Sequence, residues 1–171
     1  RQVAGTLESW QPQQMTETAL GAARSIAARI VGALGGRGVF GVELLVRGDE
    51  VYFSDITAIP RDSALVTLRS QRLSEFELHA RATLGLPVDT IMISPGAAEV
   101  VYGGGDLTGA LTGAVASALR VTESDVRVFA APSASGPALR ALGVALATAP
   151  DGAKARDRVR QSANALRELW A

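Results

Sequence analysis

Two segments rich in β-branched and aliphatic side chains, separated by a short polar turn, constrain this chain more than any other feature. They span residues 39–46 and 51–57, with the turn at residues 47–50. Two such runs around a Gly-containing turn are typical of a β-hairpin. Glu43 and Asp55 each interrupt the apolar pattern of one strand. The hairpin therefore carries two acidic side chains, and the pairing of its strands decides whether they share a face.

The register of the hairpin decides whether Glu43 and Asp55 meet. Strand side chains alternate between two faces, so a shift of one residue moves a whole set of side chains to the other face. A three-residue loop pairs the two carboxylates on one face, whereas a two-residue loop places Asp55 on the opposite face. We expect the three-residue loop, because it also leaves Tyr52, Ser54 and Ile56 over the apolar face.

Two carboxylates in a cross-strand pair repel each other unless water or a cation separates them. A hard divalent ion that also carries phosphates is one such cation. The alternative is that Glu43 and Asp55 are solvent-facing side chains on a half-exposed sheet, and the residue pattern alone favours this alternative. The pattern leaves both interpretations open.

The rest of the chain predicts an α+β fold with two subdomains that meet near residues 90–95. Three- and four-residue spacing of apolar side chains predicts helices, and short apolar runs between Gly, Ser and Pro predict strands. The expected helices are 16–34, 74–84, 111–119 and 151–170, and the expected strands after residue 95 are 97–102, 126–130 and 142–147. Residues 1–15 are polar and contain a proline, so we expect an extended lead-in.

The composition excludes several classes of function. The chain has 17 basic and 17 acidic side chains, so its net charge is zero, which argues against a dedicated nucleic-acid binder. It has no cysteine, and therefore neither disulfides nor a thiolate metal site. No apolar run is long enough for a membrane span. Because the 171 residues begin with Arg1, we expect a processed chain or a fragment.

Several long motifs occur in an order that resembles a known family. They are residues 8–13, 35–44, 48–55, 66–68, 73–76 with His79, 84–87 and 142–147. Together they resemble the C-terminal part of the formate-dependent phosphoribosylglycinamide formyltransferases, which are ATP-grasp enzymes of purine synthesis. The resemblance implies the C-terminal half of an ATP-grasp domain over residues 1–92, with an antiparallel sheet and flanking helices. It implies a small, mostly β C-terminal domain with helices over residues 93–171.

The resemblance also implies an activity. The family uses ATP to activate formate as formyl phosphate, and the amine of glycinamide ribonucleotide then captures the formyl group. By resemblance, Glu43 and Asp55 hold Mg²⁺ together with the ATP phosphates, and Asp62 and Arg140 contact the nucleotide substrate. The family implies a cytoplasmic homodimer that acts on small molecules, with neither nucleic acid nor membrane as a partner.

The chain departs from the family pattern at five positions. Asp55 stands where the family usually has Glu, and Ile59 and Arg61 replace an Arg and a His. Ala131 and Ala141 replace a substrate-binding Lys and the second of two arginines. Each lost charge-assisted hydrogen bond costs about 1.5–3 kcal/mol. Two alternatives follow: a degenerate, non-catalytic domain for dimerisation or interaction, and an ATP-grasp ligase for another carboxylate.

Overall fold

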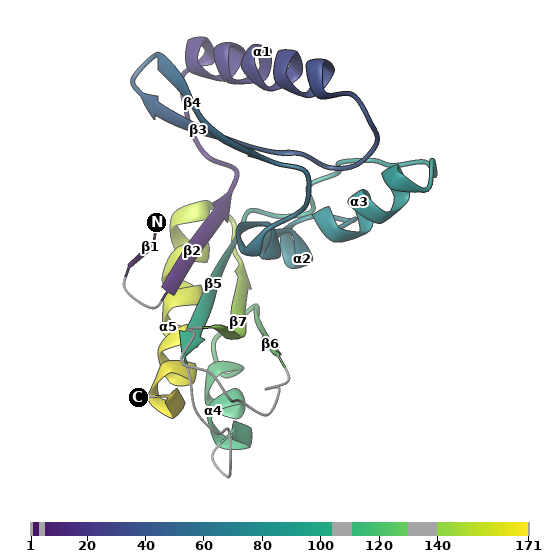
Figure 1. Ribbon diagram of the computed structural model, residues 1–171. Helices are drawn as coiled ribbons and strands as arrows, with labels where there is room; N and C mark the ends of the chain where they lie inside the picture. The colour runs from purple at the N-terminus through teal and green to yellow at the C-terminus, as the bar shows by residue number, and fades with distance from the viewer. Residues whose placement is uncertain (1, 4–5, 104–110, 130–139, 171) are drawn as a thin grey trace. The chain divides into compact units, whose positions relative to one another are not determined.

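The structure, a computed structural model, describes residues 2–3, 6–103, 111–129 and 140–170 (Figure 1). Helices accompany antiparallel sheets, which confirms the predicted α+β class. The chain divides into two compact units. Unit 1 consists of Arg1–Pro12, Asp62–Ser74 and Thr90–Ala171, and unit 2 of Gln13–Arg61 and Glu75–Asp89.

Unit 1 is built on one antiparallel sheet with the strand order β1-β2-β5-β7-β6. The strands are β1 Gln2–Val3, β2 Thr6–Gln11, β5 Gly96–Gly103, β6 Ser124–Val128 and β7 Arg140–Thr148. The expected lead-in at residues 1–15 thus contains a sheet strand, because every residue of β2 pairs with β5. Its polar side chains gave no strand pattern, and its partner lies about ninety residues away in sequence.

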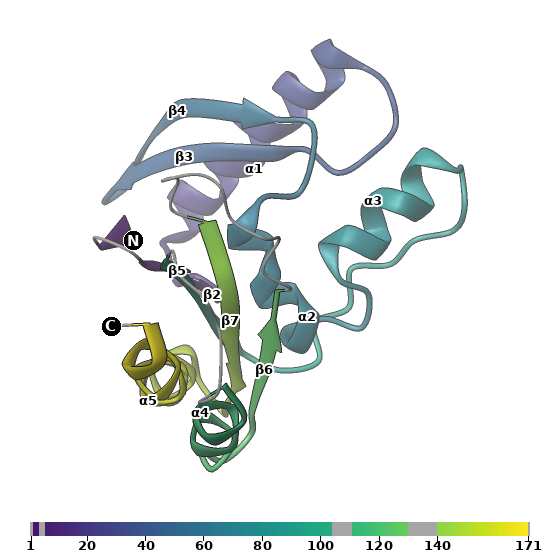
Figure 2. The same ribbon diagram turned by 60° about the horizontal axis from the view of Figure 1, so that its bottom comes forward.

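Helices α4 (Leu111–Ala118) and α5 (Gly152–Trp170) cover one face of this sheet (Figure 2). The α5 side chains in this interface are fully buried and meet small side chains of the sheet. They are Val159, Ala163 and Leu166, opposite Ala97, Ala145 and Ala147. Because alanines leave little bulk between helix and strands, the two backbones approach closely and the apolar surface is excluded from water.

The opposite face of the same sheet is covered by a short helical segment. It consists of the 3₁₀ helix η1 (Asp62–Val66) and the α-helix α2 (Thr67–Ser70). Leu65 and Val66 pack with Val100, Val144 and Leu146, all buried. Alternation along β5 therefore sends successive side chains to two different cores.

Unit 2 contains the predicted hairpin and two helices. Its elements are α1 Glu17–Leu34, β3 Gly41–Arg47, β4 Glu50–Thr57 and α3 Glu75–Thr83. Thr16 caps α1, since its side-chain oxygen accepts a hydrogen bond from the Ala19 N–H at 3.1 Å. His79 on α3 accepts a hydrogen bond at Nδ1 from the Val39 N–H at 3.1 Å and so ties α3 to the segment that leads into β3.

The predicted boundary near residues 90–95 lies close to Thr90, where the chain returns to unit 1. The chain also passes between the units after Pro12, Arg61 and Ser74. The division into residues 1–92 and 93–171 stays a prediction about sequence domains, because these compact units are not continuous in sequence. No helix in the described part of the chain is long and apolar enough to cross a membrane.

Candidate functional site: a hairpin with paired carboxylates

The turn of the β3–β4 hairpin has two residues, so the expected three-residue loop is wrong. Arg47 pairs with Glu50 across the turn, and Leu44 pairs with Phe53 farther along. Gly48, in the turn, has a φ of +62°. Glycine adopts this left-handed conformation at little cost, which allows the shorter connection.

A β-bulge nevertheless places Glu43 opposite Asp55. The register shifts between Glu43 and Leu44, so that Ser54 is an extra residue on β4 and Asp55 becomes the partner of Glu43. Without the bulge, the two-residue turn would have sent Asp55 to the other face of the hairpin. The predicted pairing of the carboxylates is therefore present, but the bulge and not the loop length produces it.

The bulge also changes which side chains share the apolar face. Val51 and Phe53 follow the alternation set by the turn, and Ile56 rejoins this face beyond the bulge. The expectation for Ile56 agrees with this arrangement, whereas Tyr52 and Ser54 do not lie on that face. Tyr52 pairs with an exposed leucine, and Ser54 is the bulged residue. A shift of one residue within a strand explains the difference.

The two carboxylates are open to solvent and lightly held. The Ser54 hydroxyl donates a hydrogen bond to Glu43 Oε1 at 2.9 Å. Arg61 Nη2 lies 3.8 Å from Asp55 Oδ2, and the Asp55 side chain is 55% exposed. Two such contacts orient the carboxylates and leave most of their oxygen lone pairs available to an added ligand.

These oxygens suit a magnesium ion that also binds phosphates. Mg²⁺ keeps several waters and is usually held by one or two carboxylates plus substrate oxygens, rather than by a cage of protein ligands. Within the described ranges, no group of three or more His, Cys, Asp or Glu could hold a metal ion by itself. A pair of exposed carboxylates fits the magnesium–phosphate case better than a closed metal centre.

The two residues predicted to contact the nucleotide substrate come to the same end of the unit 1 sheet. Asp62 begins η1 and accepts a hydrogen bond from the Tyr102 hydroxyl at 2.5 Å. Tyr102 pairs with Ala141 on β7, and the neighbouring pair is Gly103 with Arg140. The topology thus brings the backbone of Arg140 close to the Asp62–Tyr102 pair, although its side chain lies outside what the structure describes.

The positions that depart from the family pattern lie in different surroundings. Ile59 is 61% exposed, and Ala141 packs against the apolar core beside η1. Ala131 lies outside the described residues. Arg61, which replaces the family's His, lies beside Asp55 and forms an ion pair with it.

Sequence reasoning missed Ser54 and Tyr102 as contacts of the candidate residues. Ser54 is the bulged residue beside Glu43, and its hydroxyl donates to that carboxylate. Tyr102 and Asp62 are 40 residues apart and meet through the packing of η1 on the sheet. The register of a two-residue turn would have indicated the Ser54 contact, whereas a local sequence pattern carries no signal for the contact between Tyr102 and Asp62.

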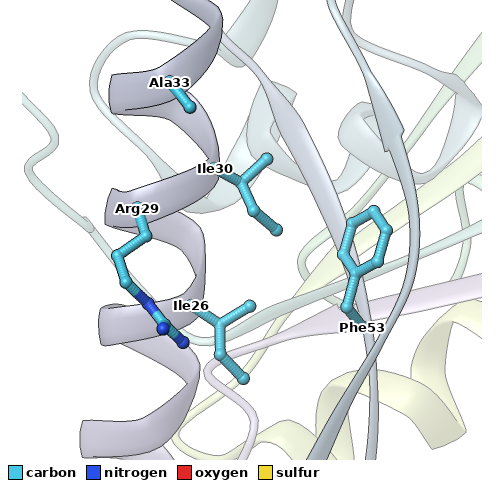
Figure 3. Close-up of a pocket in the computed structure, with 5 residues that line it drawn as sticks. All are labelled: Ile26, Arg29, Ile30, Ala33 and Phe53. Carbon is cyan, nitrogen blue, oxygen red and sulfur yellow. The ribbon is translucent and has the colours of Figure 1, made fainter.

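An apolar groove lies on the other side of the hairpin. Ile26, Arg29, Ile30 and Ala33 of α1 line it together with Phe53 of β4, and it encloses about 630 Å³ (Figure 3). Arg29 is the polar residue of this lining, and the register directs Phe53 away from the Glu43–Asp55 face. A groove without converging polar groups offers no chemistry, so the carboxylate pair is the better candidate site.

Two protein-family models match the chain. The ATP-grasp domain matches residues 2–76, and the PurT C-terminal domain matches residues 96–166. A protein of Rhodococcus jostii named formate-dependent phosphoribosylglycinamide formyltransferase is 54% identical over 158 residues, which are 92% of this chain and 39% of that protein. The Corynebacterium efficiens protein of the same name is 58% identical over 160 residues, or 94% and 39%.

Solved structures agree with these matches. Glycinamide-RNase-transformylase T from Mycobacterium tuberculosis superimposes with a TM-score of 0.81 at 60% identity, covering 95% of this chain and 46% of that one. Carboxyaminoimidazole ribonucleotide synthase from Aspergillus clavatus, solved with ATP, superimposes with a TM-score of 0.76 at 22% identity, covering 96% and 43%. The second likeness concerns the fold alone. The chain spans less than half the length of each of these four proteins.

Proposed function

Since this chain corresponds to the C-terminal part of the formate-dependent phosphoribosylglycinamide formyltransferases, as its motifs predicted, we propose that it serves the same reaction within a full-length enzyme. That enzyme activates formate with ATP and transfers the formyl group to the amine of glycinamide ribonucleotide. The observation that carries the proposal is the pairing of Glu43 with Asp55 on an open hairpin.

In this proposal, Glu43 and Asp55 hold Mg²⁺ together with the ATP phosphates. When bound, the ion neutralises phosphate charge, which in-line phosphoryl transfer requires. The chain's own side chains supply orientation: the Ser54 hydroxyl directs Glu43, and Arg61 lies beside Asp55. Because Arg61 is 64% exposed, its guanidinium can turn toward an incoming anion and release Asp55 to the metal.

Asp62 and Arg140 contact the nucleotide substrate in this proposal. A carboxylate accepts hydrogen bonds from an amine or a hydroxyl, and a guanidinium pairs with a phosphate. Their convergence at one end of the unit 1 sheet supports a shared role. The absence of the family's cations at Ala131 and Ala141 predicts weaker nucleotide binding than the family pattern provides.

The test is Glu43→Gln in the full-length enzyme. The variant keeps the shape of the side chain and loses its charge, so formate-dependent ATP hydrolysis should fall by orders of magnitude while the unfolding midpoint does not fall. Leu45→Gln, on the same face of the same strand, is a matched control and should keep its activity. Unchanged hydrolysis by Glu43→Gln would refute the proposal.

A degenerate domain for dimerisation or interaction is the second candidate function. The replacement of cationic positions by Ile59, Ala131 and Ala141 favours it, and the retained carboxylate pair opposes it. In that case Glu43→Gln would change nothing measurable in the full-length protein. Formate, acetate and bicarbonate as alternative substrates would separate the formyltransferase from a ligase that acts on another carboxylate.

The isolated 171-residue chain should have no turnover. It spans 39% of its formyltransferase relatives, and the resemblance implies that the rest of the ATP site lies in the part of the family's chain that it does not span. Calorimetry with magnesium and ATP measures this directly. Tight binding by the isolated chain would show that the carboxylate hairpin needs no further part of the family's fold.

A further inference from the structure

The family motifs assign no role to the contact between Tyr102 and Asp62. The Tyr102 hydroxyl donates to Asp62 Oδ2 at 2.5 Å, and both side chains are half-buried. A hydrogen bond from a phenol to a carboxylate is charge-assisted, and such bonds are short and comparatively strong. One oxygen of Asp62 is therefore engaged within the protein, and the direction of the other is set by the geometry of the carboxylate.

The tyrosine ring is held where its hydroxyl meets Asp62. It packs against the apolar core that Leu65 and Val66 of η1 form with the sheet, together with Phe129. A register shift between Val101 and Tyr102 makes the small Ala141 its neighbour on β7. Bulges redirect side chains next to them, and a small neighbour leaves room for a large ring. The phenol is thus placed before any ligand arrives.

The phenol remains a donor throughout the neutral range. Burial raises the pKa of Tyr102 well above its ordinary value, and the hydrogen bond and negative charge of Asp62 raise it further. A neutral hydroxyl next to a carboxylate can only donate to it. The Tyr102 hydroxyl therefore orients the Asp62 carboxylate by donating to it.

We propose that Tyr102 is a positioning residue for Asp62: it occupies Oδ2 and presents Oδ1 to a hydrogen-bond donor of the nucleotide substrate. This inference rests on the proposed function, in which Asp62 contacts glycinamide ribonucleotide. Fixing a carboxylate before binding removes the cost of ordering it in the complex. The effect should appear in the affinity for the nucleotide and not in the ATP-dependent activation of formate.

The test is Tyr102→Phe in the full-length enzyme, because phenylalanine keeps the packed ring and removes only the hydroxyl. The KM for glycinamide ribonucleotide should rise about tenfold, as expected when one hydrogen bond to a charged group is lost. Formate-dependent ATP hydrolysis without the nucleotide, the KM for ATP and the unfolding midpoint should stay unchanged. A role confined to packing would not produce this split between substrates.

Tyr52→Phe is the matched control. Tyr52 is the other tyrosine of the chain, lies on the hairpin and is 51% exposed. Removing its hydroxyl should change none of the kinetic constants. Asp62→Asn should also raise the KM for the nucleotide, and Tyr102→Phe should then add little, because both changes remove the same oriented acceptor.

Two outcomes would overturn the inference and leave the proposed function standing. One is a KM for the nucleotide that Tyr102→Phe does not change. The other is a loss of stability with equal rises in KM for ATP and nucleotide, which would make Tyr102 a purely structural residue. If the unmodified enzyme shows no formate-dependent ATP hydrolysis, the proposed function fails and the inference fails with it.

Discussion

In two places in this chain, two carboxylates lie opposite each other on antiparallel strands. One of these pairs is buried beside arginines, and the other is exposed. Glu8 on β2 is the partner of Glu99 on β5, and Glu43 on β3 is the partner of Asp55 on β4. Like charges placed directly opposite each other destabilise a sheet. Positive charge or water must offset this repulsion, and the two pairs differ in how much positive charge the protein supplies.

The Glu8–Glu99 pair lies under α5, which supplies three arginines. Arg156 Nη2 lies 3.1 Å from Glu8 Oε2, Arg160 Nε lies 3.0 Å from Glu8 Oε1, and Arg167 forms an ion pair with Glu99. The two glutamate side chains are only 10% and 5% exposed. Spacings of four and seven residues put the three arginines on one side of the helix. This pair is neutralised within the protein and serves the fold.

Among the residues that the structure describes, none covers the Glu43–Asp55 pair with several arginines in this way. It has one hydroxyl contact and one exposed arginine 3.8 Å away. This difference in cover shows that the same cross-strand arrangement of carboxylates occurs in two different environments. Where the protein supplies the cations, the pair holds a helix on a sheet. Where it leaves the carboxylates open, a ligand can supply the charge.

Breaking the buried pair should give the largest effect on stability. Arg167→Met removes the guanidinium and leaves Glu99 buried without that partner, so the free energy of unfolding should fall by about 3–5 kcal/mol. Urea denaturation of the chain measures it. Arg47→Met is the matched control, because it removes an arginine from the exposed Arg47–Glu50 pair and should cost less than about 1 kcal/mol. Equal losses of unfolding free energy in the two variants would show that burial does not set the cost of removing a charged partner.

The pH dependence of Glu8 gives a second, smaller effect. Burial alone would raise its pKa, but hydrogen bonds and charge from Arg156 and Arg160 outweigh burial and hold the pKa below the ordinary value of 4.5. A depressed pKa in the folded state means that Glu8 stabilises the protein above pH 4.5 and that this contribution is lost as the pH falls through the folded pKa.

Glu8→Gln tests that sign. At pH 7 the variant should be less stable than the original chain, and the difference should shrink as urea titrations are repeated at lower pH. A difference that stays constant from pH 7 down to acid unfolding would show that the carboxylate charge does not contribute. Glu50→Gln, which alters an exposed partner, should show little difference at any pH.

The open pair should give the smallest effect on stability, with the opposite sign. Glu43→Gln relieves repulsion from Asp55 and should leave the free energy of unfolding unchanged or raise it by about 0.2–1 kcal/mol. The same urea titrations measure it. A marked loss of stability would mean that Glu43 is a structural residue like Glu99, and the comparison between the two pairs would fail.

Much of the secondary structure followed from local patterns. The cap at Thr16, the apolar periodicity up to Leu34 and the two β-rich runs predicted α1 and the hairpin. The strand at Thr6–Gln11 was missed, because it is polar and its pairing partner is distant in sequence. Elements with their own periodicity can be predicted locally, whereas a strand defined by its neighbour cannot.

The candidate site could likewise be predicted only in part. The motifs around Glu43, Asp55 and Asp62 identified the acidic residues, but they could not supply the contacts made by Ser54 and Tyr102. The predicted meeting of Glu43 with Asp55 was right although the loop length behind it was wrong. A bulge adds one residue to one strand, and its position depends on how both strands pack on their surroundings.

By itself, the sequence determined most of the helices and strands, which acidic residues could carry chemistry, and which family the motifs resemble. The tertiary structure decided which carboxylates are neutralised and which stay open. That decision depends on whether a helix with suitably spaced arginines packs over a given pair of strands. Such packing joins residues 68 to 152 positions apart, and charge becomes costly only once burial removes it from water.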